Sequence, residues 1–402
     1  MVKTLRRAWN TLRGQGLRLV IQKAALRLYP LALAKESLVH GEDALAVDWR
    51  TPKAGTPLTV ARPLRTAWIM SPPGANSGGH QNIFRFLKVL EDAGHEVRIY
   101  LYSTFDTHTP GEVRAMIAGS SSYPDLRASI EYIPASGIPA GTDAIFATSW
   151  ETAYASYRDP SEARRFYFVQ DFEPLFYPMS SEAVLAENTY RFGFYGITAG
   201  HWLETKLARD YGMRTSSFDF GSDPRAYHLI DGVERDSVFF YARPETPRRG
   251  FELGVMALQH FSRLRPDVPI ITAGQSLHGL RLPFTVEDRG NVQVAELGAL
   301  YNRCAAALVL SLSNLSLLPL ELLACGTVPV VNSGENNQLV SANPLIEYTE
   351  PIPLALGERL AAVMSRPDRD DHARRAAASV ALSSWTASGD QFLAAVDRGM
   401  RG

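Results

Sequence analysis

Three arginines near the middle of the chain have the residue type and spacing of an anion clamp. In YARPETPRRGFELG, Arg243 ends an expected strand, and Arg248 and Arg249 stand just before an expected helix. Guanidinium groups form bidentate bonds with phosphate oxygens and stay charged at any working pH. At the carboxyl ends of parallel strands they are placed to grip a diphosphate. The alternative is a solvated basic loop.

A pair of acids stands in the aromatic-rich segment YFVQDFEPLFYP, residues 167–178. Asp171 and Glu173 follow directly after an expected strand. Carboxylates beside aromatic faces are typical of a sugar site, so both acids are candidate sugar-binding residues. The alternative is a structural ion pair or a helix cap.

A glycine-rich turn, PPGANSGGHQNIFRF, joins an expected strand to an expected helix at residues 72–86. Glycines such as Gly78 and Gly79 let a ligand approach the backbone, and the helix amides then face an anion. His80 is either a donor to a sugar or a helix-capping residue. The turn does not match the G-x-G-x-x-G fingerprint, and no acid clearly ends the second strand, which disfavours a dehydrogenase.

A further motif, SLSNLSLLPLELLACGTVPVVNSG, covers residues 311–334. A strand runs into an apolar loop containing Asn314 and Leu315, and an expected helix starts near Pro319. Glu321 falls in the first turn of that helix, where a carboxylate suits the helix dipole. Glu321 could equally accept hydrogen bonds from a ribose diol. We assign Asn314, Leu315 and Glu321 to donor binding.

Two series of alternating strands and helices must position these motifs. Such alternation predicts parallel sheets with helices on both faces, so the fold class is α/β with two Rossmann-like, doubly wound domains facing each other across a cleft. The strands expected in the two series are 66–70, 96–102, 130–133, 144–149 and 166–170, then 237–242, 269–274, 291–295, 306–311 and 328–332.

The predicted organisation has four parts. Residues 1–60 form a basic helical segment and linker, 61–225 an acceptor domain and 226–383 a nucleotide-sugar domain. Residues 384–402 form a helix that packs back across the domains. Every charged side chain in residues 1–35 is basic, and the first acid is Glu36. This pattern suggests a basic amphipathic helix on an anionic membrane face. A helix packed on the enzyme, or a loose tail, is the alternative. The cations are Lys3, Arg6, Arg7, Arg13, Arg18, Lys23, Arg27 and Lys35.

Composition narrows the class of protein further. The 402 residues are 46% hydrophobic with a net charge of −1, which argues against general affinity for nucleic acid. Cys304 and Cys325 both have apolar neighbours and are expected to be reduced in a cytoplasmic protein. Cysteines and histidines nowhere show metal-ligand spacing, so we expect neither a structural metal nor another cofactor.

In chain order, the glycine-rich turn, the arginine segment and residues 311–334 resemble the family-4 retaining glycosyltransferases of the GT-B fold. In such an enzyme we assign Asp171 and Glu173 to acceptor binding and give Asp171 a catalytic role as well. Arg243 matches the family's arginine, Arg249–Gly250 matches its Lys-Gly pair, and Glu321 matches the second acid of its Glu-x7-Glu motif. The resemblance covers about residues 66 to 400. It implies that a nucleotide-diphosphate sugar binds mainly to the second domain, that no metal is bound, and that the anomeric configuration is retained.

One position departs from the family pattern. The residue eight before Glu321 is Ser313, or Asn314 with a one-residue gap, where the family has its first Glu. That Glu usually meets the transferred sugar, so its loss puts the usual hexose donors in doubt. Residues 167–178 resemble the bacterial rhamnosyltransferase branch, which uses dTDP-rhamnose to build cell-surface polysaccharide and has members that also lack the first Glu.

The resemblance therefore implies transfer of L-rhamnose to a polysaccharide or lipid-linked glycan, with Arg243 and Arg249 stabilising the leaving diphosphate. The enzyme would be cytoplasmic, either free or attached peripherally to the inner face of the cell membrane. Two alternatives stay open. One is a UDP- or GDP-sugar transferase of the same fold, and the other is a non-catalytic sugar-binding scaffold in glycan assembly.

Overall fold

The computed structural model describes residues 41–402 apart from 60–62, 75–76 and 103–107. The chain divides into two compact units, Met1–Val47 and Asp48–Gly402. In the first unit the description begins with the short helix α3 (Gly41–Leu45). The predicted membrane-binding segment, residues 1–35, lies outside the described residues. Among the described helices, none has the length and apolar character needed to cross a bilayer.

A seven-stranded parallel sheet forms the first domain of the larger unit. Its order is β3-β2-β1-β4-β5-β6-β7, so the chain winds outward in both directions from β1 and β4. Strands β5 and β6 are buried along their whole length because helices cover both faces, as a parallel sheet requires. The strands are β1 (Arg65–Met70), β2 (Glu96–Leu101), β3 (Ser129–Tyr132), β4 (Ala144–Ala147), β5 (Arg164–Val169), β6 (Tyr195–Ala199) and β7 (Thr215–Phe218).

The helices of the first domain form where apolar residues recur at helical spacing. In the helix after β1, Ser77 caps the start, and Phe84, Leu87 and Leu90 face the sheet. The elements are α4 (Gly78–Asp92), α5 (Pro110–Gly119), α6 (Trp150–Arg158), η1 (Glu173–Phe176), α7 (Ser181–Asn188), η2 (Thr189–Arg191) and α8 (His201–Tyr211).

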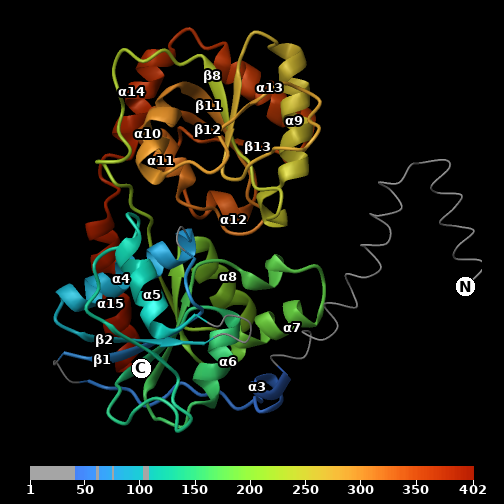
Figure 1. Cartoon of the computed structure of the whole chain (residues 1–402). Coiled ribbons are helices and arrows are strands. Elements are labelled where there is room, and N and C mark those ends of the chain that lie inside the picture. The colour runs from blue at the N-terminus through green and yellow to red at the C-terminus, as the bar shows by residue number, and fades with distance from the viewer. Residues whose placement is uncertain (1–40, 60–62, 75–76, 103–107) are drawn as a thin grey trace, which may run out of the picture. The chain divides into compact units, whose positions relative to one another are not determined.

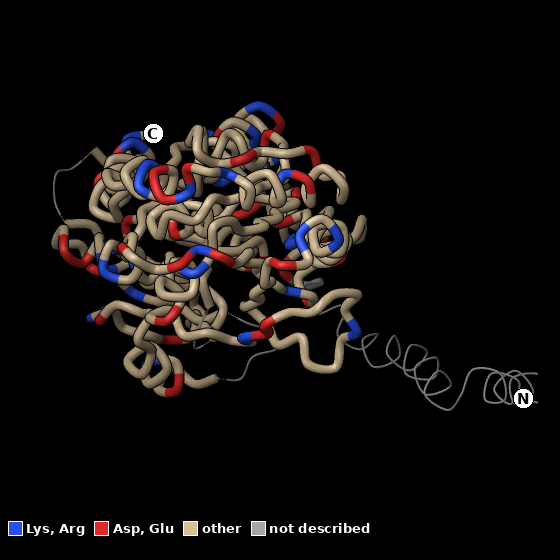
Figure 2. The backbone as a smooth tube through the Cα atoms, turned by 90° about the horizontal axis from the view of Figure 1, so that it is seen from above, with Lys and Arg blue, Asp and Glu red and all other residues tan. Residues whose placement is uncertain are grey.

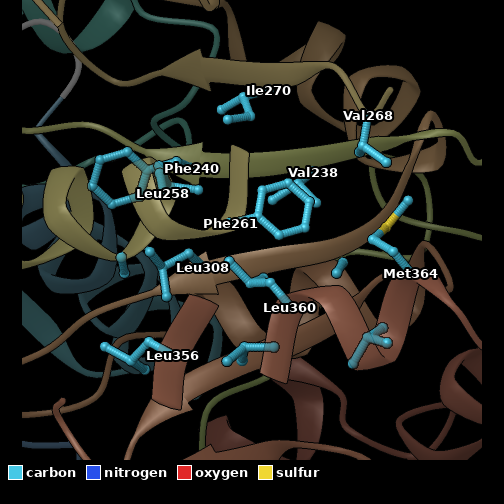
Figure 3. Packing of buried hydrophobic residues seen from close by; sticks show 14 of the residues in the cluster. Val238, Phe240, Leu258, Phe261, Val268, Ile270, Leu308, Leu356, Leu360 and Met364 are labelled. Carbon is cyan, nitrogen blue, oxygen red and sulfur yellow. The ribbon is translucent and has the colours of Figure 1, made fainter. Parts of the chain in front are cut away.

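A six-stranded parallel sheet, ordered β10-β9-β8-β11-β12-β13, forms the second domain. Its core joins side chains of β8 and β11 to α9 and α13, with Phe240, Phe261 and Leu360 interdigitating (Figure 3). The strands are β8 (Ser237–Tyr241), β9 (Ile270–Ala273), β10 (Glu287–Asp288), β11 (Cys304–Val309), β12 (Val328–Asn332) and β13 (Glu347–Thr349). The helices are η3 (Pro247–Arg249), α9 (Phe251–Leu264), α10 (Val294–Asn302), α11 (Leu318–Ala324), α12 (Glu335–Gln338), α13 (Pro353–Met364) and α14 (Arg369–Ser379).

The prediction of a strand at residues 291–295 is wrong. Helix α10 begins at Val294 after Gln293 as its N-cap, and Glu296 lies in its first turn. Downstream, Leu300 and Tyr301 are buried in the second-domain core, and this pattern belongs to a helix. The five-residue apolar alternation was too short to distinguish a strand from the start of a helix.

The last helix, α15 (Trp385–Arg401), returns to the first domain. Arg164 of β5 donates from Nε to the carbonyl oxygen of Gly399 at 2.7 Å. A Cβ at Gly399 would lie 2.3 Å from the Phe166 ring, so only glycine allows this approach. Figure 1 shows α15, in red, beside α4 although it ends the chain. The two connections between the domains pair at Ser222 and Ser384.

Charges of both signs are interspersed along the described backbone. Seen from above in Figure 2, basic and acidic residues alternate over the elements, and neither sign forms a continuous stripe in this view. In this view the described residues therefore present no continuous basic stripe to a polyanion.

Candidate active site

The carboxylate of Asp171 lies where the end of β5 meets a loop of the second domain. Its Oδ1 accepts a hydrogen bond from the Asn314 backbone N–H at 2.8 Å, and its Oδ2 accepts one from Ser313 Oγ at 3.0 Å. The side chain is only 12% exposed. Burial raises the pKa of Asp171, and the bond from the Asn314 amide opposes that rise. The result is a fixed carboxylate, largely removed from water, shared by both domains.

Asn314 fastens the same loop to the first domain through its side chain. Its Nδ2 donates to the carbonyl oxygens of Gln170 at 3.1 Å and Ala199 at 2.9 Å. An amide nitrogen must face two carbonyls, so the orientation of the side chain is determined. Asn314 is 3% exposed, and its Oδ1 has no hydrogen-bond partner among the described residues. That oxygen is itself buried, so it is an unpaired acceptor inside the domain junction.

Buried asparagines of the second domain hold this loop from behind. The carbonyl oxygen of Ser311 accepts from Nδ2 of Asn332 at 2.9 Å and of Asn337 at 3.2 Å. Asn332 Oδ1 in turn accepts from the Ser311 backbone N–H at 2.8 Å. Asn337 is fully buried. A satisfied buried network of this kind gives the loop one conformation.

Arg248 approaches Asp171 from the turn before α9. Its Nε lies 3.4 Å from Asp171 Oδ2, and its guanidinium stacks on the Phe176 ring at 4.1 Å from the ring centroid. Its backbone carbonyl oxygen accepts from Leu312 N–H at 2.9 Å, which ties the arginine turn to the site loop. Burial lowers the pKa of Arg248, yet a guanidinium remains charged.

Arg243 and Arg249 complete the group. Arg243 follows β8 and donates to the Gly274 carbonyl oxygen at 3.3 Å, and Arg249 lies close enough to lower the pKa of Asp171. Gly250 has φ of 58°, a left-handed conformation that turns the chain directly into α9. No described side chain caps the start of α9.

Glu321 lies apart from this group, in the first turn of α11. It is half-buried and accepts a hydrogen bond from the Tyr227 hydroxyl. Removal from water raises its pKa to about 8, while Arg85 of α4 acts in the opposite direction. The predicted ribose-binding carboxylate therefore faces a cation that belongs to the first domain.

The glycine-rich turn is held by its own residues. His80 contacts Ser77 Oγ through Nδ1 and the Ser71 carbonyl oxygen through Nε2, each at 2.9 Å. A carbonyl only accepts, so Nε2 carries the proton, and burial lowers the pKa of this imidazole. Gly78 and Gly79 have no positive φ, and an added Cβ would meet nothing within 4 Å at Gly78. Neither conformation nor packing requires glycine there, which leaves room for a ligand.

Gly78→Ala therefore separates stability from binding. Alanine is the better helix former, by up to about 1 kcal/mol, so the melting temperature should stay equal or rise. If a nucleotide sugar fills the open space, its affinity should fall by roughly tenfold, or about 1.4 kcal/mol. Gly119→Ala at the end of α5, which also meets no atom within 4 Å, is the control and should leave affinity unchanged. Equal affinities by calorimetry would remove Gly78 from the donor site.

Two predicted site residues are placed elsewhere. Glu173 is 5% exposed and points into the first domain, where Oε2 accepts from Trp150 N–H at 2.7 Å and Oε1 from the Tyr167 hydroxyl at 3.0 Å. Burial, then Glu151, raises the pKa of Glu173 to about 8. Leu315 is 1% exposed within the second-domain core. Neither side chain joins the group around Asp171.

The described residues contain no cluster of three or more His, Cys, Asp or Glu side chains that could hold a metal ion. Sequence reasoning missed Gln170 and the role of Ser313, both of which contact the site. Their only signal was adjacency to Asp171 and Asn314, because the partners come from distant parts of the chain.

Comparisons with known proteins agree with this architecture. Residues 236–361 match the family model of the WsaF C-terminal domain. An O-antigen biosynthesis protein, RfbC, from Myxococcus xanthus is 32% identical over 340 residues, covering 81% of this chain. The chain spans about a quarter of that relative's length (26%).

Solved structures share the fold at low identity. A sucrose-phosphate synthase from Thermosynechococcus elongatus aligns with a TM-score of 0.62 and 14% identity, over 83% of this chain and 98% of its own. WaaG, a glycosyltransferase involved in lipopolysaccharide biosynthesis, aligns with a TM-score of 0.59 and 13% identity, over 82% and 98%. The predicted architecture is confirmed: two parallel sheets, each with its helices, build a GT-B fold.

Proposed function

We propose that the protein is a glycosyltransferase that moves L-rhamnose from dTDP-rhamnose to a polysaccharide or lipid-linked glycan, with retention of configuration. The observation that carries the proposal is the junction of Asp171, Arg248 and the Ser313–Asn314 loop, which places a carboxylate, a cation and a free amide oxygen together between two Rossmann-like domains. The likeness to an O-antigen biosynthesis protein supports the polysaccharide product.

In this proposal Arg243, Arg248 and Arg249 stabilise the charge that develops on the leaving diphosphate. The bond from the sugar's anomeric carbon to the phosphate oxygen breaks, and a bond to the acceptor oxygen forms on the same face. The departing phosphate oxygen takes the acceptor's proton. Before transfer, Asp171 accepts a hydrogen bond from the acceptor hydroxyl and orients it, and this bond is given up as the proton passes to the phosphate oxygen. Asn314 lies beside the sugar. Glu321 accepts from the ribose. No metal takes part.

The relative's name places it in O-antigen biosynthesis. A lipid-linked acceptor would bring the enzyme to the membrane surface. We therefore also propose that the basic residues 1–35 hold the enzyme at the inner, anionic face of the cell membrane, where each cation near the surface contributes about 1 kcal/mol.

A nucleotide screen tests the donor. A ligand that binds only the folded state raises the melting temperature in proportion to its affinity, and we expect dTDP to raise it more than UDP or GDP at equal concentration. Incubation with dTDP-rhamnose and a rhamnose-terminated acceptor should then yield an extended glycan. A larger shift with UDP or GDP would replace rhamnose by another sugar, and binding without turnover would favour a sugar-binding scaffold.

A further inference from the structure

Gln170 stands directly before Asp171, and its polar groups contact two segments that are distant in the sequence, the first turns of helix α4 and the second-domain loop. Its side-chain Nε2 donates to the Gly79 carbonyl oxygen at 3.1 Å, and its Oε1 accepts from Asn82 Nδ2 at 3.2 Å. Its backbone carbonyl oxygen accepts from Asn314 Nδ2 at 3.1 Å. One half-buried residue thus joins the start of helix α4, which is the end of the glycine-rich turn, to the second-domain loop.

We propose that Gln170 is a positioning residue that fixes the glycine-rich turn relative to Asp171 and to the loop of the second domain. The proposal rests on the proposed function and extends it to a residue that touches neither reacting group. Gln170 acts by holding in place the glycine-rich turn and the second-domain loop, which together must align donor and acceptor.

The donor and the acceptor are determined for each hydrogen bond in the series from Arg85 through Asn82 and Gln170 to Gly79. The Arg85 guanidinium can only donate, and its Nη1 donates to Asn82 Oδ1 at 3.0 Å. Asn82 must then present Nδ2 to Gln170, which accepts through Oε1 and donates through Nε2 to Gly79. The relay therefore has one orientation, and the glutamine cannot flip without losing both side-chain bonds.

Arg85 anchors the relay at the domain junction. Its guanidinium lies over the Trp385 ring at 3.6 Å from the centroid, so the start of the last helix supports α4 at this point. Burial lowers the pKa of Arg85 to about 10, which leaves it charged at neutral pH, and Glu321 opposes that fall. The hydrogen bonds from Arg85 through Asn82 to Gln170 thus connect Trp385 with the residue next to Asp171.

Gln170→Met tests the proposal because methionine keeps the side-chain length and removes both side-chain hydrogen bonds. Displacing catalytic groups by about 1 Å can cost on the order of a hundredfold in rate. We expect kcat to fall by roughly tenfold to a hundredfold. The affinity for dTDP alone should hold, since the arginines that grip it belong to the second domain. Amides 77–84 should exchange hydrogen for deuterium faster.

The matched control is Gln391→Met in α15. Gln391 is also half-buried and also makes one donor and one acceptor bond, both to Asp219, at 3.0 and 2.7 Å. It should lower stability about as much without changing kcat. Equal loss of kcat in both variants would mean general loosening and would overturn the positioning role.

Gln170→Glu adds a pH readout that a space-filling role would not produce. The carboxylate cannot donate to Gly79, whereas the protonated carboxyl can, so the ratio of variant to wild-type rate should rise as pH falls from about 8 to 5. A flat ratio, or an unchanged kcat in Gln170→Met, overturns the inference. A wild-type chain that transfers no sugar from any donor refutes the proposed function instead, and the exchange rates of amides 77–84 still decide whether Gln170 holds the turn.

Discussion

Asp171→Asn should lose sugar transfer while the fold and nucleotide binding survive. Asparagine has the same shape, and its oxygen can still accept the Asn314 N–H bond that fastens the loop. The charge that, in the proposed function, orients the acceptor hydroxyl is then absent. Groups that handle a proton or a hydroxyl in a transition state contribute about 10²- to 10⁴-fold, so kcat should fall by at least about a hundredfold. Steady-state transfer and dTDP calorimetry measure the two effects separately.

The pH dependence provides a second check on Asp171. Burial raises its pKa in the folded enzyme, so the active carboxylate is lost as pH falls through that raised value and is present above it. Wild-type kcat should rise with pH on the acid side, and the residual rate of Asp171→Asn should lack that limb.

Asp219→Asn, at the end of β7 on the same sheet edge, is the control for Asp171. Asp219 bonds Gln391 rather than the second-domain loop, so its replacement should change neither the rate nor the acid limb. If Asp171→Asn abolished dTDP binding in a folded protein, Asp171 would belong to the donor site and not to the acceptor site.

Arg249→Ala is expected to weaken dTDP binding strongly without unfolding the protein. The residue is half-buried at the turn into α9, beside Arg248 and Asp171. Hydrogen bonds to charged groups are worth about 1.5–3 kcal/mol, which corresponds to a loss of roughly tenfold to a hundredfold in affinity. Because the diphosphate gains charge as it leaves, kcat should fall as well.

Arg263→Ala near the far end of the same helix removes the same charge at an exposed position and serves as the control. It should leave dTDP affinity within experimental error. If Arg249→Ala and Arg263→Ala bound dTDP equally, the clamp would be reassigned to Arg243 and Arg248, of which Arg248 already holds Asp171.

The local pattern of apolar and polar residues was sufficient to predict most of the fold. The strands Arg65–Met70 and Val328–Asn332 are short, mostly apolar and mostly buried runs between turn residues. The helix Gly78–Asp92 repeats its apolar residues every three to four positions. Two such series imply two parallel sheets, which the structure confirms. The pattern failed at residues 291–295, where a short apolar alternation leads into α10.

The sequence by itself also determined which chemistry the chain carries: guanidinium groups after β8, acids after β5 and a glycine-rich turn after β1, all at the ends of strands. It could not decide between Asp171 and Glu173. Two positions apart, they would share one side of an extended chain, but the turn of η1 begins at Glu173 and carries its carboxylate into the aromatic core. Only Asp171 remains at the domain junction.

Only the tertiary structure decided the partners of Asp171. Asn314 lies 143 residues away in the chain, and no periodicity relates the two positions. Their contact follows from the packing of two sheets that bring the ends of β5 and β11 together, and from the energetic need to pair buried polar groups. Helix and strand patterns arise from neighbours within a few residues, whereas hydrogen bonds between domains depend on the placement of every element between them.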